Sequence, residues 1–134
     1  MGRSGAFTWK GKQLMKNIYM KSKSKMHNIK VMYDNISFHS KKEANRYADL
    51  KLLAKGGVIK DLKLQVPFEV VPKQPGERAV KYYADFTYYD NRINKFVIED
   101  TKSDFTRKKD SYIIKRKLVK LQYTNEDTVF LEYI

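Results

Sequence analysis

Two strand-like runs between residues 82 and 102 constrain this chain most, because both carry acidic residues among apolar ones. The first reads YYADFTYY, the second reads KFVIEDTK, and the polar residues DNRIN between them are typical of a turn. β-Branched and aromatic residues favour strands, so the pattern predicts an antiparallel hairpin. Asp100 and Lys102 are two residues apart and would project from one face of their strand, with Glu99 on the other face. Because a buried charge must be paired or bind a metal, the hairpin carries either an ion-pair ladder on a half-exposed sheet or a functional site.

Length and composition indicate one folded domain with its own core. The chain has 134 residues, of which 42% are hydrophobic. It has no cysteine and two histidines, which excludes disulfides and thiolate metal sites and argues against a histidine-built zinc site. No apolar run has the length of a membrane span or the form of a signal peptide, so we expect a soluble, intracellular protein without a membrane partner.

The charge is strongly basic and uneven. Lys and Arg number 28 against 15 Asp and Glu, a net charge of +13, which points to a polyanionic partner. Residues 1–42 hold ten basic residues and one acidic residue. We expect residues 1–28 to form a flexible basic arm whose Lys21, Lys23 and Lys25 contact phosphates; a solvated tail is the alternative.

Local signals predict the remaining elements of a single domain over residues 29–134. Residues 29–33 and 36–38, separated by Asp34-Asn35, predict a hairpin. Ser40 and Glu43 have the spacing of a capping box and predict a helix over residues 41–55 that ends at Gly56-Gly57. Alternation then predicts a strand over residues 61–71, followed by the central hairpin, a helix over residues 107–122 and a strand over residues 128–134.

The helix over residues 107–122 combines an apolar side with a basic surface. The apolar side is predicted to hold Ile113, Ile114, Leu118 and Leu121. The basic surface is the expected nucleic-acid contact of the folded domain, through Lys108, Lys109, Lys115 and Arg116. A solvated lysine face is the alternative.

Element order and motifs together resemble a known nuclease superfamily. The motifs are FHSKKEANRY at residues 38–47, LQVPF at 64–68, YYADF at 82–86 and IEDTK at 98–102. With the order helix, three strands, helix, strand, they resemble the PD-(D/E)XK superfamily, and within it a small phage-encoded group of the DUF1064 type. The resemblance implies an α/β fold with a restriction-endonuclease-like α-β-β-β-α-β core, a mixed sheet flanked by helices.

The resemblance also implies a metal-dependent active site. Asp85 and Asp100 would bind Mg²⁺, with Mn²⁺ as the alternative, assisted by the backbone carbonyl of Thr101 and by Glu43. Lys102 would orient or deprotonate the attacking water and offset negative charge in the transition state. Hard divalent ions prefer such oxygen ligands, and they polarise phosphate and acidify water.

Several assignments stay open in the sequence. Ala84 stands where the superfamily often has proline before its first acid. Glu99 could replace Asp100, although it is out of phase with Lys102. Glu43 could act near the metal or only close the capping box. Arg46 and Gln65 are weaker candidates, with a surface ion pair and a strand-edge amide as their respective alternative roles.

The expected function is that of a Mg²⁺-dependent phage endodeoxyribonuclease in the bacterial host cytoplasm. Its substrate is DNA, and by analogy with resolvases of the superfamily, branched or recombination-intermediate DNA. The alternative is a non-catalytic nucleic-acid-binding phage protein on the same scaffold. Whether the protein is a monomer or a homodimer stays open.

Overall fold

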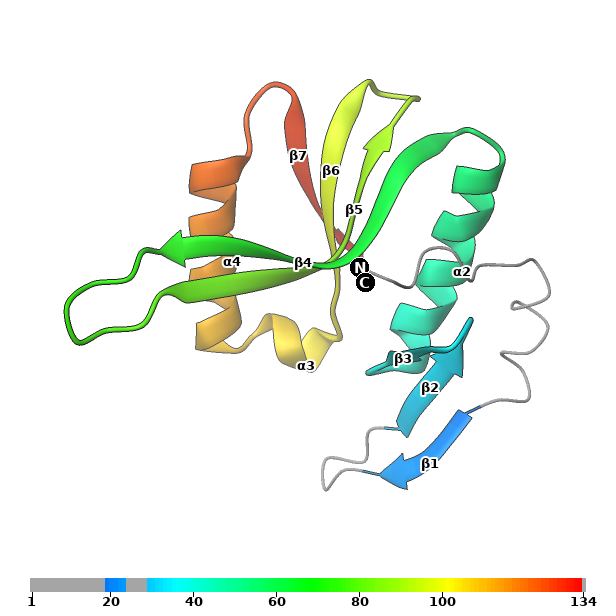
Figure 1. Ribbon diagram of the computed structural model, residues 1–134, viewed down its shortest axis with the longest axis horizontal. Helices are drawn as coiled ribbons and strands as arrows, with labels where there is room; N and C mark the ends of the chain where they lie inside the picture. The colour runs from blue at the N-terminus through cyan, green and yellow to red at the C-terminus, as the bar shows by residue number, and fades with distance from the viewer. Residues whose placement is uncertain (1–18, 24–28, 134) are drawn as a thin grey trace. The chain divides into compact units, whose positions relative to one another are not determined.

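The computed structural model describes residues 19–23 and 29–133, which belong to two compact units, Met1–Leu50 and Lys51–Ile134 (Figure 1). The division between the two units falls within helix α2 (Lys41–Lys55). Of the predicted basic arm, Tyr19–Lys23 form strand β1, and the rest of residues 1–28 lies outside the described residues. Among the described helices, none has the length and apolar character needed to cross a membrane.

The first unit is built on a three-stranded antiparallel sheet in the order β1-β2-β3. Strands β2 (Ile29–Tyr33) and β3 (Ile36–Phe38) form the predicted hairpin. The two turn residues, Asp34 and Asn35, have φ values of 54° and 62°, and two successive left-handed residues are what a two-residue hairpin turn requires. Alternate side chains of this hairpin are buried and supply the core: Val31, Tyr33, Ile36 and Phe38.

Helix α2 begins and ends where the sequence predicts. At its start, the Glu43 amide donates to Ser40 Oγ at 3.1 Å. At its end, Val58 N–H bonds the Leu53 carbonyl at 2.9 Å, and Gly57 has a φ of 77°. This is the Schellman arrangement, in which a left-handed glycine stops a helix.

The second unit contains a four-stranded mixed sheet in the order β4-β5-β6-β7. Strands β4 (Ile59–Val71), β5 (Val80–Asp90) and β6 (Lys95–Thr101) are antiparallel, and β7 (Thr128–Tyr133) is parallel to β6. A parallel connection needs a crossover, which helices α3 (Asp104–Arg107) and α4 (Asp110–Tyr123) provide. The predicted mixed α/β class is therefore confirmed.

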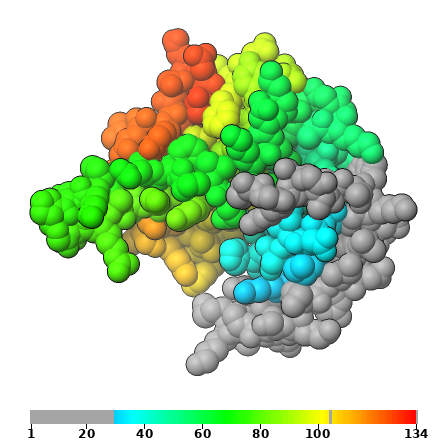
Figure 2. Space-filling view, viewed as in Figure 1, coloured from blue at the N-terminus to red at the C-terminus, as the bar shows by residue number. Residues whose placement is uncertain are grey.

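Helix α4 closes the core of this unit. Tyr112 and Val119 of α4 pack with sheet residues in one apolar cluster whose other buried members are Val70, Tyr82, Ala84 and Ile98. At the end of α4, Gln122 Nε2 donates to the Val70 carbonyl at 2.8 Å, and β4 crosses the helix (Figure 1). The far end of the β4–β5 ribbon, in green, projects from this unit (Figure 2).

The prediction of a single helix over residues 107–122 is wrong in two respects. A short helix already begins after Ser103, whose hydroxyl accepts from the Thr106 amide at 3.2 Å, and the chain breaks before α4 starts at Asp110. The predicted apolar side is also wrong, because Ile114 and Leu121 are 58% and 79% exposed. Tyr112 and Val119, two helical turns apart, face the core instead.

Candidate functional site

In the sheet of the second unit, strands β5 and β6 stop pairing next to Asp85. Pairing between β5 and β6 ends at Phe86 opposite Glu99, one step short of Asp85. On the other side, Gln65 of β4 has a φ of 52°, a left-handed conformation that is uncommon for a residue other than glycine. Strand β4 is bent within the sheet, and β5 and β6 diverge beyond their last paired residues (Figure 1). Asp85 therefore lies where two strands separate.

Two donors hold the Asp85 carboxylate. The Thr101 amide donates to Oδ2 at 2.8 Å, and Gln65 Nε2 donates to Oδ1 at 3.1 Å. The first bond replaces the backbone bond that the separated strands can no longer make. Gln65, a weaker candidate in the sequence, is thus a direct partner of Asp85.

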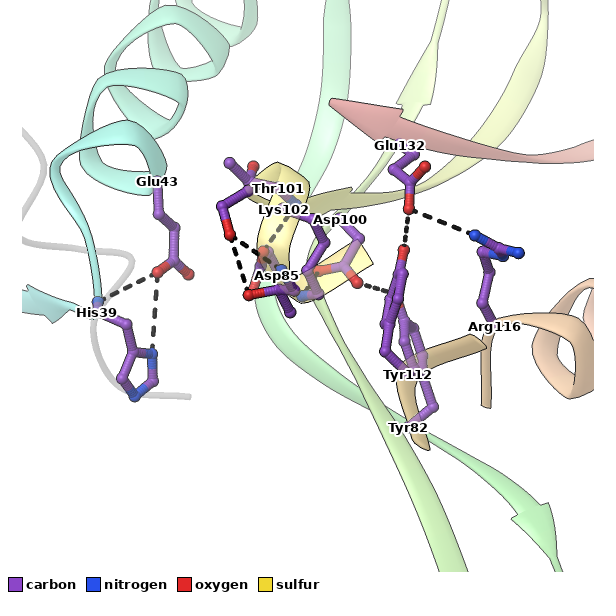
Figure 3. A network of polar contacts seen from close by, with 12 residues as sticks. His39, Glu43, Tyr82, Asp85, Asp100, Thr101, Lys102, Tyr112, Arg116 and Glu132 are labelled. Atoms are coloured by element: carbon purple, nitrogen blue, oxygen red, sulfur yellow. Dashed lines mark hydrogen bonds and ion pairs between the residues drawn. The ribbon is translucent and has the colours of Figure 1, made fainter. Parts of the chain in front are cut away.

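Asp100 is fully buried on the neighbouring strand. Lys102 Nζ donates to its Oδ1 at 2.7 Å, and the Tyr82 hydroxyl donates to its Oδ2 (Figure 3). Extending the β5–β6 register by one step sets Asp85 opposite Asp100, and opposite residues of an antiparallel pair share a face. The structure thus brings the predicted Asp85, Asp100, Thr101 and Lys102 together.

The two carboxyl groups influence each other electrostatically. Burial, then the charge of Asp85 and a hydrogen bond with Asp85, raise the pKa of Asp100 from 3.8 to about 7, although Lys102 lowers it. Burial, followed by the charge of Asp100, likewise raises the pKa of Tyr82 far above its usual value, so Tyr82 stays a donor. Asp100 therefore exchanges a proton near neutral pH, as expected for two acids that share one site.

A second polar cluster borders Lys102. Lys102 Nζ lies 5.1 Å from the ring centroid of Tyr112, and the guanidinium of Arg116 lies 5.6 Å from it. The Tyr112 hydroxyl donates to Glu132, which also pairs with Arg107 at 3.6 Å and Arg116 at 3.8 Å (Figure 3). Tyr112 therefore joins the Asp100–Lys102 pair to a carboxylate held by two arginines.

Sequence reasoning missed Tyr82, Arg107, Tyr112 and Glu132 as members of the site. Glu132 carried the signal that marked Asp85, a charged residue within an otherwise apolar strand. The tyrosines carried no such signal, because aromatic residues are common in any core.

Glu99 makes different contacts from Asp100. It is fully buried and accepts a hydrogen bond from the Tyr88 hydroxyl at 2.6 Å. Lys102 pairs with Asp100, in agreement with the alternation that puts residues 100 and 102 on one face.

Comparison with known proteins identifies the family. A family model described as "Protein of unknown function (DUF1064)" matches residues 23–132. The chain belongs to this family. Neither curated proteins nor solved structures gave a significant match.

In this DUF1064 protein, Glu43 has the contacts of a helix cap. Its side chain accepts from the His39 amide at 3.2 Å, while its own amide bonds Ser40 (Figure 3). Glu43 belongs to the first unit. Its capping role is confirmed, and its role near a metal stays a prediction.

The predicted nucleic-acid-binding residues have different surroundings. Lys108 and Lys109 are exposed between α3 and α4, and Lys115 and Arg116 are half-buried on α4. Lys21 and Lys23 fall within β1, and Lys25 lies outside the described residues.

Over the described residues, no group of three or more Asp, Glu, His or Cys side chains has the arrangement of a metal site. Asp85 and Asp100 are a pair of oxygen donors, and a cation there would need further ligands from the backbone, solvent or substrate.

Proposed function

We propose that this DUF1064 protein is a metal-dependent endonuclease of the PD-(D/E)XK type that hydrolyses DNA phosphodiester bonds. One observation carries the proposal. Asp85 and the Asp100–Lys102 ion pair, with 2.7 Å between Lys102 Nζ and Asp100 Oδ1, occupy neighbouring strands at the point where the sheet opens. Carboxylates and an ammonium group are the residue types that metal-assisted phosphodiester cleavage needs.

The element order supports a restriction-endonuclease-like core. Helix α2 precedes three antiparallel strands, and α4 then leads to a strand parallel to β6. This is the α-β-β-β-α-β succession that the motifs imply. Because unrelated activities share folds, the proposal depends on the site more than on this succession.

The donor set fits a hard divalent cation. Asp85 and Asp100 offer carboxylate oxygens, which hard cations prefer. Burial and the charge of Asp85 raise the pKa of Asp100 to about 7, so a bound cation would favour the ionised form of Asp100 over the protonated one. Thr101 Oγ1 is buried and makes no hydrogen bond within the described part of the chain, so a water or ligand would find a free partner there. The Thr101 carbonyl remains a candidate ligand.

The chemistry divides among the residues as follows. A divalent cation, Mg²⁺ or Mn²⁺, would polarise the phosphodiester and acidify a bound water. Asp85 and Asp100 would hold the cation, while Gln65 and Tyr82 fix the orientation of the two carboxylates. Lys102, whose ammonium group is paired with Asp100, would orient the attacking water or neutralise charge on the phosphorus.

The expected substrate is DNA. A net charge of +13 and the exposed Lys108 and Lys109 favour a polyanion. Preference for branched or recombination-intermediate DNA rests on analogy with resolvases, as does a role in a phage-infected bacterial cytoplasm.

Two measurements on the same protein test the proposal. Thermal melts with increasing Mg²⁺ or Mn²⁺ should show a rise in Tm, because a ligand at 100 times its Kd stabilises the native state by about 2.7 kcal/mol. Supercoiled, linear, single-stranded and four-way-junction DNA should then be cleaved with the cation and left intact in EDTA. Asp85→Asn should lose both effects, whereas Glu77→Gln, which removes an exposed acid, should keep both. Cleavage that survives in Asp85→Asn and in Asp100→Asn would contradict the assignment.

A non-catalytic nucleic-acid-binding protein is the second candidate. Both oxygens of Asp100 already have a donor, Lys102 on one and Tyr82 on the other, which favours a purely structural carboxylate. That function predicts DNA binding without any rise in Tm on addition of Mg²⁺ and without cleavage of any DNA form.

A further inference from the structure

An exposed aromatic residue stands next to the candidate site. Phe105 lies on α3, three residues after Lys102, and 66% of it is exposed. Three residues of chain reach at most about 11 Å, which limits the distance between the backbones of Lys102 and Phe105. A large apolar side chain with this exposure contributes little to the core and is available to a partner.

The surroundings of Phe105 are basic and locally ordered. Residues 102–110 contain four basic residues (Lys102, Arg107, Lys108, Lys109) and two acidic ones (Asp104, Asp110). Lys109 Nζ lies 5.1 Å from the ring centroid of Phe105. The Ser103 hydroxyl, which caps α3, is also 3.0 Å from Thr106 Oγ1. The helix turn thus presents one aromatic ring with cations beside it.

This combination matches a particular chemistry. Aromatic rings bind the π-face of nucleobases, and neighbouring cations bind the phosphates of the same strand. In a continuous duplex each base is covered by its neighbours, so a ring stacks most readily on a base that is unpaired or turned out.

We infer that Phe105 is a stacking platform for an unpaired base of a nucleic-acid strand whose phosphates lie against Lys108 and Lys109. The inference rests on the proposed function and specifies its substrate class as DNA with a single-stranded or unpaired nucleotide within a few positions of the scissile bond. The ammonium of Lys109 leaves part of the ring surface to the base. Base stacking then orders the strand next to Lys102.

The test measures binding without cleavage. Fluorescein-labelled single-stranded DNA and the matching perfect duplex are titrated in EDTA at fixed ionic strength. The proteins are the wild type, Phe105→Ala, Phe105→Leu, Phe105→Trp and a control. The control is Leu121→Ala, which removes an exposed apolar side chain from α4, outside the proposed surface. A second titration uses a strand with 2-aminopurine, whose emission falls when the base stacks.

Phe105→Ala and Phe105→Leu should bind single-stranded DNA about 5- to 100-fold more weakly, the range expected for one stacked base, and bind duplex within about twofold of the wild type. Phe105→Trp and Leu121→Ala should bind both as the wild type does. The 2-aminopurine quenching should persist in Phe105→Trp and disappear in Phe105→Ala.

Two results would overturn the inference. One is that Phe105→Ala changes the affinity for single-stranded and duplex DNA equally, or changes neither. The other is a change in the mass of the free protein in Phe105→Ala, measured by light scattering, because the ring would then contact a second copy. The titrations contain no divalent cation, so they test stacking independently of cleavage. Loss of the stacking inference would leave cleavage by the wild type unaffected, and absence of cleavage would leave the binding result unaffected.

Discussion

Replacing Asp85 by asparagine should stabilise the protein above neutral pH while abolishing the proposed cleavage. The substitution keeps the shape and the contacts of the side chain. Its Oδ1 can still accept from the Thr101 amide, and Gln65 can turn its own amide so that Oε1 accepts from the new Nδ2. What changes is the negative charge facing Asp100.

The size of the effect follows from the strand geometry. Opposite residues of a paired antiparallel ladder have Cβ atoms about 4.5–5.5 Å apart, which is a lower bound for Asp85 and Asp100 because the β5–β6 pairing ends one step before them. Two unit charges about 5 Å apart repel by about 3 kcal/mol at an effective dielectric constant of about 20, and by less than about 1 kcal/mol in water. For 134 residues, 1 kcal/mol corresponds to about 3–4 °C in Tm, so a gain between about 3 and 10 °C is expected.

The gain should depend on pH in a definite direction. The pKa of Asp100 is raised from 3.8 to about 7, so between these values the folded protein binds more protons than the unfolded chain. Wild-type stability therefore falls as pH rises from about 4 to about 7. Without the charge of Asp85, the pKa of Asp100 should move down and this loss should shrink.

Thermal melts in EDTA at pH 5 and pH 8.5 and constant ionic strength measure the difference. Asp85→Asn should exceed the wild type in Tm at pH 8.5 and approach it at pH 5, where Asp100 of the wild type is protonated and the repulsion is absent. Glu77→Gln is the control for loss of an exposed charge. A variant that is less stable than the wild type at pH 8.5, or shifted equally at both pH values, would refute the coupling between the two acids.

Two further substitutions separate binding from chemistry and from stability. Lys102→Ala should lower turnover about 10²- to 10⁴-fold, as expected for loss of a group that acts on the attacking water or the transition-state charge, and leave the midpoint of a Mg²⁺ thermal titration at pH 8.5 nearly unchanged. Full rescue of the cleavage rate by excess Mg²⁺ would instead give Lys102 only an assembly role. Tyr112→Phe should lower Tm by about 3–4 °C, for about 1 kcal/mol of lost hydrogen bond to Glu132, and leave turnover nearly unchanged because the ring beside Lys102 remains. A large loss of turnover in Tyr112→Phe would give its hydroxyl a part in the chemistry.

Elements with local signals were predictable from the sequence. The turn at Asp34-Asn35, the cap at Ser40 and the stop at Gly57 each depend on a few neighbouring residues, and the hairpin and helix they bound agree with the structure. The position of Asp100 and Lys102 on one face of β6 was also predictable, because it depends only on strand alternation.

Features set by contacts distant in sequence were not predictable. Tyr82 reaches Asp100 across 18 positions and Tyr112 reaches Glu132 across 20, and composition does not indicate which tyrosine faces an acid. The left-handed Gln65 opposes β-propensity and is held in place by the tertiary structure. The buried face of α4 is also set by tertiary packing. Tyr112 and Val119 face the core, whereas Ile114 and Leu121, which the sequence predicted to be buried, are exposed.

The charges of the site explain why a cation and the Phe105 surface should contribute separately to DNA affinity. With Asp85 and Asp100 ionised and Lys102 protonated, the three groups sum to −1, which repels a phosphodiester. A divalent cation would change that sum to +1 and make the same position attractive. The basic residues beside Phe105 do not depend on this change, so contact with the strand should survive in EDTA while engagement of the scissile phosphate should not. DNA affinity that rises with Mg²⁺ in the wild type but not in Asp85→Asn would therefore distinguish the metal's contribution from that of the stacking surface.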